Sequence, residues 1–199
     1  FTLNEANNFS SFTITGLHRT MHEQLKKSNC QEKTAGVHLK FKKNHFALGT
    51  TISNYWFSHA FQPNNEILAA QFTPGKNYMK IGADVLLIHK NQTYFAELAS
   101  DDKHQTLNFI GGTLFALSRH VSVGIVYLRY SHRFFTYHSN ALGKNSSNTN
   151  EESFYTKSTL EIGSFKLFLN WMISHQPFMM SEIHGREKTY RETFQIEKT

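Results

Sequence analysis

The sequence predicts an all-β protein, an antiparallel up-and-down transmembrane β-barrel of about ten strands. Three observations lead to this fold class. Aromatic residues make up 14% of the 199 residues, and 18 Phe and 8 Tyr against 3 Pro favour extended strands. Apolar and polar residues alternate along most of the chain, which is the period of a strand with two unlike faces. Short and long connections also alternate, as in outer-membrane barrels, whose tight turns and longer loops lie on opposite rims.

No stretch approaches the roughly 18 to 20 apolar residues of a membrane-spanning helix. A helical membrane protein is thus excluded, whereas a membrane barrel is not. We treat residues 1–199 as a single domain, which forms a barrel or a segment of a larger barrel. The formal net charge of +6 comes from basic residues that are spread along the chain, with one tight group at Lys40, Lys42 and Lys43. This distribution is typical of solubilising charge, and attraction to nucleic acid or anionic lipid is the alternative.

The strand pattern is clearest between Thr34 and Phe41, where Val37 and Leu39 alternate with His38 and Lys40. It continues after a polar turn through Phe46, Leu48, Thr50 and Ile52. The same reasoning predicts an opening strand at Phe9–Glu23 and further strands at Tyr78–His89, Gln92–Ser100, Thr106–Ser118, Val121–Arg133, Phe154–Ile162, Phe165–His175 and Thr189–Glu197. Lengths of about 9 to 12 residues match tilted membrane strands.

The connections between these strands fall into two kinds. Tight links are expected at Lys42–His45, Lys90–Asn91, Arg119–His120 and Gly163–Ser164. Long polar connections are expected at Trp56–Asn77, Phe134–Ser153 and Gln176–Lys188, with Asp101–Gln105 of intermediate length. This sorting favours an outer-membrane barrel, and a soluble barrel or sandwich with the same alternation is the alternative.

Two sets of residues follow from the barrel hypothesis. Polar residues that alternate with lipid-facing ones are candidates to line the lumen: His38, Lys40, Lys80, Asp84, Glu97, Lys166 and Asn170. A hydrated interior without further function is the alternative for these positions. Aromatic residues near strand ends are candidates for the bilayer interface: Tyr55, Trp56, Phe57, Tyr127, Tyr130 and Trp171.

The residue types that carry chemistry show no catalytic or metal-binding spacing. The 12 His lie scattered and lack Cys, Asp or Glu partners at a ligand spacing, and Cys30 is the one thiol. We therefore expect no metal, no cofactor and no enzyme activity. The remaining enzymatic alternative is a barrel lipid hydrolase that uses Ser and His, for which the adjacent pairs are Ser131-His132, His138-Ser139 and Ser174-His175.

Several segments together carry a family resemblance: Phe12–Thr20, Tyr94–Ala99, Val121–Val123, Tyr127–Tyr130, Tyr137–Ser146 and Asn150–Tyr155. Their order and spacing resemble the β-barrel region of Bacteroidota outer-membrane proteins that carry helix-hairpin-helix motifs upstream. The resemblance extends from about Phe12 to the end of the chain. It implies localisation in the bacterial outer membrane and a porin-like, transport-associated role linked to DNA passage. It also implies the lipid bilayer and other outer-membrane proteins as partners.

The chain departs from that family in several places. Gln176–Ser181 keeps the Pro of the family segment and loses its Trp and arginines, and Lys144 replaces an acidic residue. Ile110-Gly111-Gly112 lies in a strand pattern, so the DNA-gripping helix-hairpin-helix module is not found here, and nucleic acid is a partner through the resemblance alone. The chain ends at Thr199 where such barrels commonly end on an aromatic residue, so we expect a segment of a longer barrel or a shortened relative. A structural scaffold in an outer-membrane complex is the second functional hypothesis.

Overall fold

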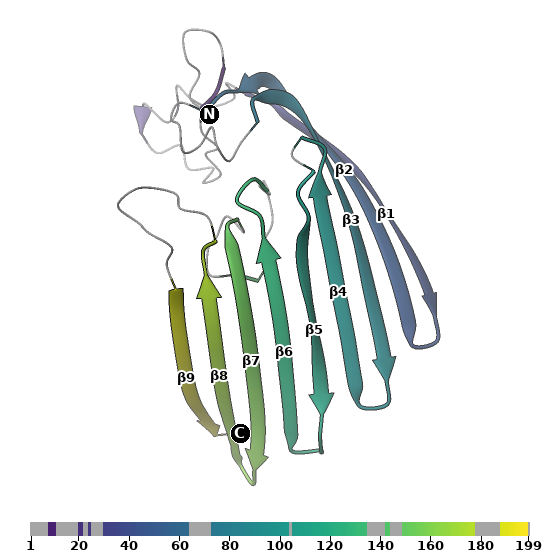
Figure 1. Ribbon diagram of the computed structural model, residues 1–199, viewed down its shortest axis with the longest axis vertical. Helices are drawn as coiled ribbons and strands as arrows, with labels where there is room; N and C mark the ends of the chain where they lie inside the picture. The colour runs from purple at the N-terminus through teal and green to yellow at the C-terminus, as the bar shows by residue number, and fades with distance from the viewer. Residues whose placement is uncertain are drawn as a thin grey trace.

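The computed structural model describes residues 8–10, 20–21, 24, 30–63, 73–103, 105–134, 142–143, 149–177 and 188–198. Nine antiparallel strands form one up-and-down sheet in which each strand pairs with the next along the chain (Figure 1). The strands are β1 (Glu32–Lys43), β2 (Phe46–Phe61), β3 (Gly75–His89), β4 (Gln92–Asp101), β5 (Asn108–Ala116), β6 (Val121–Tyr130), β7 (Glu151–Ile162), β8 (Phe165–His175) and β9 (Lys188–Lys198). The all-β, antiparallel up-and-down prediction is thereby confirmed.

The connection predicted between the second and third strands is shorter than expected. The strand β2 runs on to Phe61 and β3 begins at Gly75, so the connection predicted at Trp56–Asn77 is limited to 62–74. In this region β2 and β3 remain paired, with a register shift between Trp56 and Phe61. Such an irregularity lets one strand carry extra residues without ending the pairing.

The opening strand predicted at Phe9–Glu23 lies mostly outside the described residues. Phe9 forms a single parallel bridge to Phe61, with the Phe9 amide donating to the Ala60 carbonyl at 3.0 Å. The Gln24 amide donates to the Thr20 carbonyl at 2.9 Å, which closes a helical turn. The described end of this segment is therefore helical, and the strand prediction is wrong there. The described residues contain no helix with the length and apolar character of a membrane span.

The connections alternate as the sequence predicts. At the lower end of the sheet in Figure 1, tight turns join β1 to β2, β3 to β4, β5 to β6 and β7 to β8. The strand ends that flank the longer connections, residues 62–74, 102–107, 131–150 and 176–187, all lie at the opposite end. We call these ends the tight-turn rim and the long-loop rim. Asn44, Lys90 and Gly163 open three of the tight turns with positive φ angles of 50°, 52° and 58°, as two-residue hairpin loops require.

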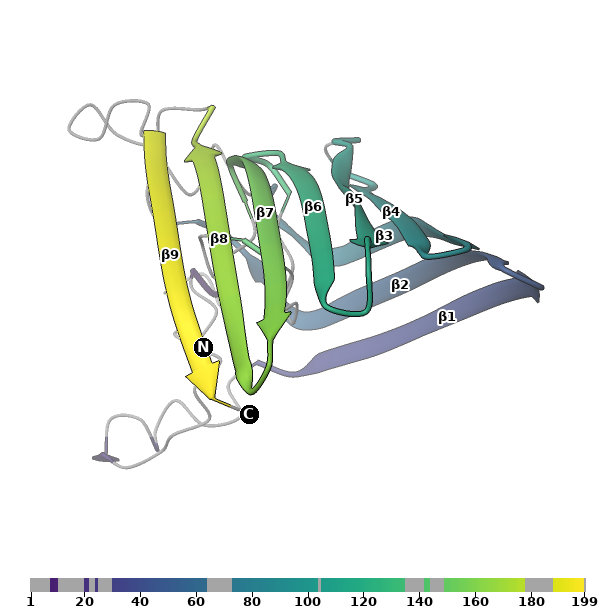
Figure 2. The ribbon, with the colours of Figure 1, turned by 90° about the horizontal axis from the view of Figure 1, so that it is seen from below.

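The strand register separates the side chains into two faces. Residues that pair across strands share a face, so the series Lys40, Gly49, Asp84 and Glu97 defines what we call the polar face. The opposite, apolar face carries Val37, Leu39 and their paired neighbours. Figure 2 shows the sheet curled into an open trough. The polar face is its concave side, because the Nζ of Lys80 on β3 lies 4.4 Å from the ring centre of Phe134, which follows β6.

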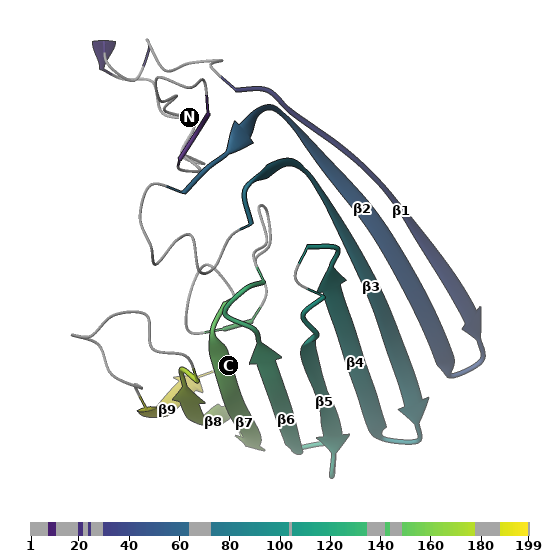
Figure 3. The ribbon, with the colours of Figure 1, turned by 45° about the horizontal axis from the view of Figure 1, so that its top comes forward.

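A small core, mostly aromatic, lies at the long-loop rim beside the ends of β2 and β3, which are the longest strands. Phe9, Cys30, Phe57, Phe61 and Tyr78 are buried together there. The Phe9 ring lies 5.4 Å from Phe57 and 5.3 Å from Phe61, measured between ring centres. Figure 3 shows the ends of β2 and β3 bending over toward this N-terminal region. The apolar contacts explain why β2 continues past the point where the sequence alternation ends.

Candidate functional site

The predicted lumen-lining residues all lie on one face of the sheet. The register places His38, Lys40, Lys80, Asp84, Glu97, Lys166 and Asn170 on the polar, concave face. Some of their neighbours on that face are also polar. His38 Nδ1 lies 2.8 Å from Thr51 Oγ1, and Lys166 Nζ lies 2.8 Å from Glu161 Oε1. The concave face therefore carries hydrogen-bonding and ion-pairing side chains on β1 to β4 and on β7 to β9, and it is largely apolar between them, on β5 and β6.

One row of this face crosses β1 to β4 and contains both charge signs. Lys40 pairs with Gly49, Gly49 with Asp84, and Asp84 with Glu97. The Asp84 carboxylate lies over Gly49, and a Cβ atom at Gly49 would collide with it. Glycine at this position thus gives Asp84 room to lean toward Lys40. The two carboxylates of Asp84 and Glu97 are on neighbouring strands, which makes this row the most acidic part of β3 and β4.

Lys80 differs from the other predicted residues because other groups cover its charge. It is paired with Asp101 across β3 and β4, and its ammonium group contacts the Phe134 ring. Asp101 is itself buried and accepts hydrogen bonds from the Lys103 amide at 3.1 Å and from Thr106 Oγ1 at 3.4 Å. Lys80 therefore belongs to the packed long-loop rim and not to open space within the trough.

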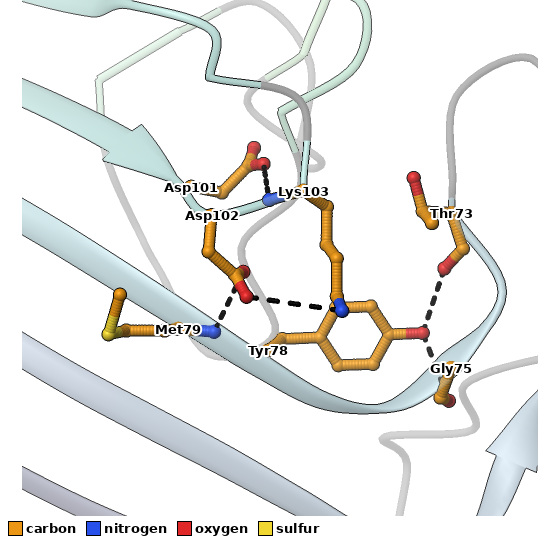
Figure 4. Close-up of polar contacts among 7 residues, drawn as sticks. All are labelled: Thr73, Gly75, Tyr78, Met79, Asp101, Asp102 and Lys103. Atoms are coloured by element: carbon orange, nitrogen blue, oxygen red, sulfur yellow. Dashed lines mark hydrogen bonds and ion pairs between the residues drawn. The ribbon is translucent and has the colours of Figure 1, made fainter.

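The same rim is tied together by backbone and side-chain contacts between β3 and the end of β4 (Figure 4). The Met79 amide donates to Asp102 Oδ1 at 3.0 Å. The Tyr78 hydroxyl donates to the Thr73 carbonyl at 2.9 Å and lies 3.1 Å from the Gly75 carbonyl. Asp102 also forms a long ion pair with Lys103, with 4.0 Å between Oδ2 and Nζ. These contacts fix the chain where β3 begins.

A second packed cluster surrounds Glu151 at the start of β7. Glu151 is 0% exposed, and its Oε1 atom accepts hydrogen bonds from Ser153 Oγ at 2.6 Å and the Tyr155 hydroxyl at 3.2 Å. Ser174 Oγ of β8 lies 3.5 Å away. A carboxylate can be buried when such donors surround it. Sequence reasoning missed this residue because it placed Glu151 in the loop Phe134–Ser153; the spacing Glu-x-Ser-x-Tyr on one strand face is the pattern that points to the cluster.

The aromatic residues predicted for the bilayer interface fall on both faces. Trp56, Tyr127 and Trp171 lie on the apolar face, whereas Tyr55, Phe57 and Tyr130 lie on the polar one. Phe57 and Tyr130 are buried, so their side chains do not lie on the outer surface of the described sheet. The reason is the period of a strand: Trp56 points away from both of its chain neighbours, and Tyr130 is three residues from Tyr127.

The apolar face carries further aromatic residues that the sequence reasoning did not single out. Near the tight-turn rim, Tyr94 and Phe115 make an edge contact with 6.4 Å between ring centres. Toward the other rim, Phe109 lies 6.0 Å from Tyr127 and Phe154 lies 6.2 Å from Trp171. Each contact joins neighbouring strands. The pairs thus form two groups at different heights on the convex face.

The pairs considered for hydrolysis do not form a catalytic arrangement in the described residues. Ser174 faces Glu151 on the polar face, whereas the adjacent His175 lies on the other face, with Nδ1 3.8 Å from Glu152 Oε2. Ser131 Oγ accepts from the Arg133 amide at 3.3 Å in the turn after β6. His138 and Ser139 lie outside the described residues. Within the described part of the chain, no group of three or more His, Cys, Asp or Glu side chains is placed to hold a metal ion.

Comparisons with known proteins do not extend this description. No protein-family model matches the chain, and no curated protein matches it. The resemblance to the Bacteroidota barrels therefore stays a prediction. The feature of the sheet that bears on function is the separation of its side chains between a convex apolar face and a concave polar face.

Proposed function

We propose that this chain forms the wall of a bacterial outer-membrane β-barrel and acts as a pore or transport-associated component. A single observation carries the proposal: apart from Ile88 and Leu114, every exposed large hydrophobic residue within a strand lies on the convex face. The concave face carries the charged rows. This distribution of polarity is that of a membrane barrel, which is apolar toward lipid and polar toward its interior.

The apolar face is too large for a surface in contact with water. Leu39 is 67% exposed and Phe194 on the far edge is 60% exposed, so the apolar surface extends from β1 to β9. Soluble monomers rarely expose apolar patches above a few hundred Å². Among the described residues there is one sheet and no second layer that covers this face. A lipid bilayer is the partner that fits a convex apolar surface of this extent.

The soluble alternatives fit the sheet less well. A soluble barrel or sandwich buries its apolar side chains inside and keeps polar residues outside. Here Glu151, Ser153 and Ser174 are buried on the concave side, while Val37, Ile52 and Leu169 are exposed on the convex side. The polarity is thus inverted relative to a soluble barrel, which favours the membrane interpretation.

The direction of the edge strands favours a larger barrel over closure by these nine strands. In the described sheet, β1 pairs only with β2 and β9 pairs only with β8. Because successive strands are antiparallel, β1 and β9 run in the same direction. An antiparallel barrel therefore needs an odd number of further strands between them. This geometry supports a wall that other strands complete.

A scaffold role is the second candidate and has its own observation. The clusters around Glu151 and Lys80 pack polar side chains against the concave face at the long-loop rim, which narrows any passage there. A link to DNA passage rests on the family resemblance alone. Measurement of conductance, described in the Discussion, separates the pore from the scaffold.

The membrane proposal is tested with the full-length protein expressed in a Gram-negative host. We expect it to sediment with outer membranes and to require detergent for extraction. In a Cys30→Ser background, Asn170→Cys should react with a water-soluble maleimide after reconstitution into vesicles. Leu169→Cys, its neighbour on the apolar face, should be protected by lipid. Recovery as a monodisperse protein without detergent, or equal labelling of the two positions, would contradict the proposal.

A further inference from the structure

A cavity of about 410 Å³ lies on the concave face over β5 to β9. It is formed by two neighbouring register rows. One row runs from Leu114 through Gly124, Lys157 and Asn170 to Thr193, and the other from Val126 through Tyr155 and Met172 to Arg191. The volume lies within the range of roughly 300 to 1,000 Å³ that is typical of small-molecule sites.

The floor and one wall of this cavity are apolar. Leu114, Val126 and Met172 come from three different strands. Leu142, from the connection between β6 and β7, also lines the cavity. Its carbonyl oxygen accepts a hydrogen bond of 2.9 Å from the Tyr130 hydroxyl, which holds this part of the connection against the concave face. The surface suits an acyl chain.

Two cationic side chains lie among these apolar residues. Lys157 and Arg191 line the cavity, and none of the described lining residues is Asp or Glu. The Lys157 ammonium lies 4.9 Å from the ring centre of Phe168, in contrast to Lys166, which pairs with Glu161. Lys157 and Arg191 stand on β7 and β9 in neighbouring register rows, two residues apart along the strands, so their backbones are roughly 12 Å apart and both long side chains can extend toward one anion between them.

We propose that this cavity binds a fatty acid, a single acyl chain with a carboxylate head. The chain lies against Leu114, Val126 and Met172, and the carboxylate meets Lys157 and Arg191. The guanidinium group of Arg191 matches a carboxylate in a bidentate arrangement. The inference goes beyond the proposed wall of a barrel, since it assigns a ligand to the concave face whether or not that face lines an open pore.

A second hollow of about 240 Å³ adjoins the first toward the tight-turn rim and shares Leu114, Gly124 and Lys157 with it. Gly124 lies between the two hollows and has no side chain to separate them. A Cβ atom at this position would lie 2.9 Å from the Cδ2 atom of Leu114. A longer acyl chain can therefore continue past Leu114.

The test is a fluorescence titration of the full-length protein, folded in a zwitterionic detergent, with dansyl-undecanoic acid as the probe. Wild-type protein should bind the probe saturably. Lys157→Gln and Arg191→Gln should each weaken binding about tenfold or more, as expected for lost charge-assisted hydrogen bonds. Lys40→Gln, which removes a cation from the same face outside the cavity, is the matched control and should leave binding unchanged.

The acyl-chain side of the site has its own pair of variants. Leu114→Asn should weaken binding, whereas Ile88→Asn should not, although both residues belong to one register row of the concave face. The uncharged methyl ester of the probe should bind more weakly than the acid to wild-type protein and equally to the Lys157→Gln/Arg191→Gln double variant. Circular dichroism and the mobility of unheated samples in detergent gels show that each variant is folded.

The outcomes separate this inference from the proposed membrane role. If folded wild-type protein inserts into membranes but the probe does not bind, or if Lys40→Gln weakens binding as much as Arg191→Gln, the fatty-acid site is wrong and the barrel proposal stands. If the protein is soluble without detergent yet binds the probe with the expected variant pattern, the site stands and the barrel proposal is wrong.

Discussion

Adjacent residues in β1 lie on opposite faces of the sheet. A pair of neighbouring substitutions can therefore test whether the two faces meet different solvents. Leu39 lies on the apolar face, and His38 lies on the polar face with its ring 2.8 Å from Thr51 Oγ1. Leu39→Arg should lower the free energy of unfolding in a bilayer by about 2 to 4 kcal/mol, because it places a charge in lipid. His38→Gln should cost about 1 kcal/mol or less, since it loses one hydrogen bond.

Urea titration of the full-length protein folded into lipid vesicles measures both variants. The two substitutions lie next to each other in one strand, so differences in strand propensity and position are small. Equal destabilisation by Leu39→Arg and His38→Gln would show that the two faces do not meet different solvents.

The buried carboxylate of Glu151 shows what single residues add beyond the alternation. Ser153, Tyr155 and Ser174 all direct hydroxyl groups to one oxygen atom or its vicinity. Removal of the acceptor would leave these donors unsatisfied, and each buried unsatisfied group costs about 1 to 3 kcal/mol. The concave face therefore packs as a polar core at the long-loop rim. This packing is stronger than that expected of a lumen lined only by hydrated side chains.

The tight turns are the elements whose backbone geometry is most constrained. Gly163 opens the turn between β7 and β8 with φ of 58°, and no heavy atom lies within 4 Å of the position a Cβ atom would take. Gly163→Ala therefore adds no clash and tests the backbone alone. It should lower the free energy of unfolding by about 1 to 2 kcal/mol.

Ser164→Ala in the same turn is the control, because Ser164 is not among the residues with positive φ. It should change the stability by less than Gly163→Ala does, since it introduces no backbone strain. Both variants are compared by the same urea titration. Equal stability of Gly163→Ala and the wild-type protein would mean that the turn adopts a different conformation in the bilayer.

At the level of strands, much of the fold was predictable because alternation and turn residues are local. The predicted bounds of β3 to β9 agree with the observed strands to within a few residues. The predicted tight links all lie at one rim of the sheet. The extension of β2 to Phe61 was not predictable, since it depends on contacts with Phe9 and Tyr78, which are distant in sequence. The same holds for Phe57 and Tyr130, whose burial depends on segments that pack over the concave face.

The site was predictable to the extent that it follows from strand period. His38, Asp84 and Asn170 share a face because period-two alternation and antiparallel register place them there. The cavity at Lys157 and Arg191 was not predictable, because it needs the side-by-side order of five strands and the position of Leu142. Alternation identifies polar positions, and only the three-dimensional structure shows which of them enclose a volume.

The molecule as a whole combines a polar trough with two edges that run in the same direction. Along the Lys40 to Glu97 row the charged side chains are exposed or half-exposed. The trough is packed around Lys80 and Glu151 at the long-loop rim. A pore formed by the completed barrel would therefore have its charged, water-filled section below that rim. This difference between the two regions determines which charges should affect ion flow.

Planar-bilayer conductance of the full-length protein distinguishes a pore from a scaffold. In a pore, Glu97→Lys should shift ion selectivity toward anions and Lys40→Glu toward cations, because both residues are exposed on the concave face. Lys80→Glu should instead reduce the yield of folded protein, since it places a third carboxylate beside Asp101 and Asp102 and removes the contact with Phe134. A sealed scaffold would give no current with the wild-type protein or with any variant. A selectivity change with Lys80→Glu alone would mean that the conducting path runs through the long-loop rim and that the packed arrangement around Phe134 opens in the membrane.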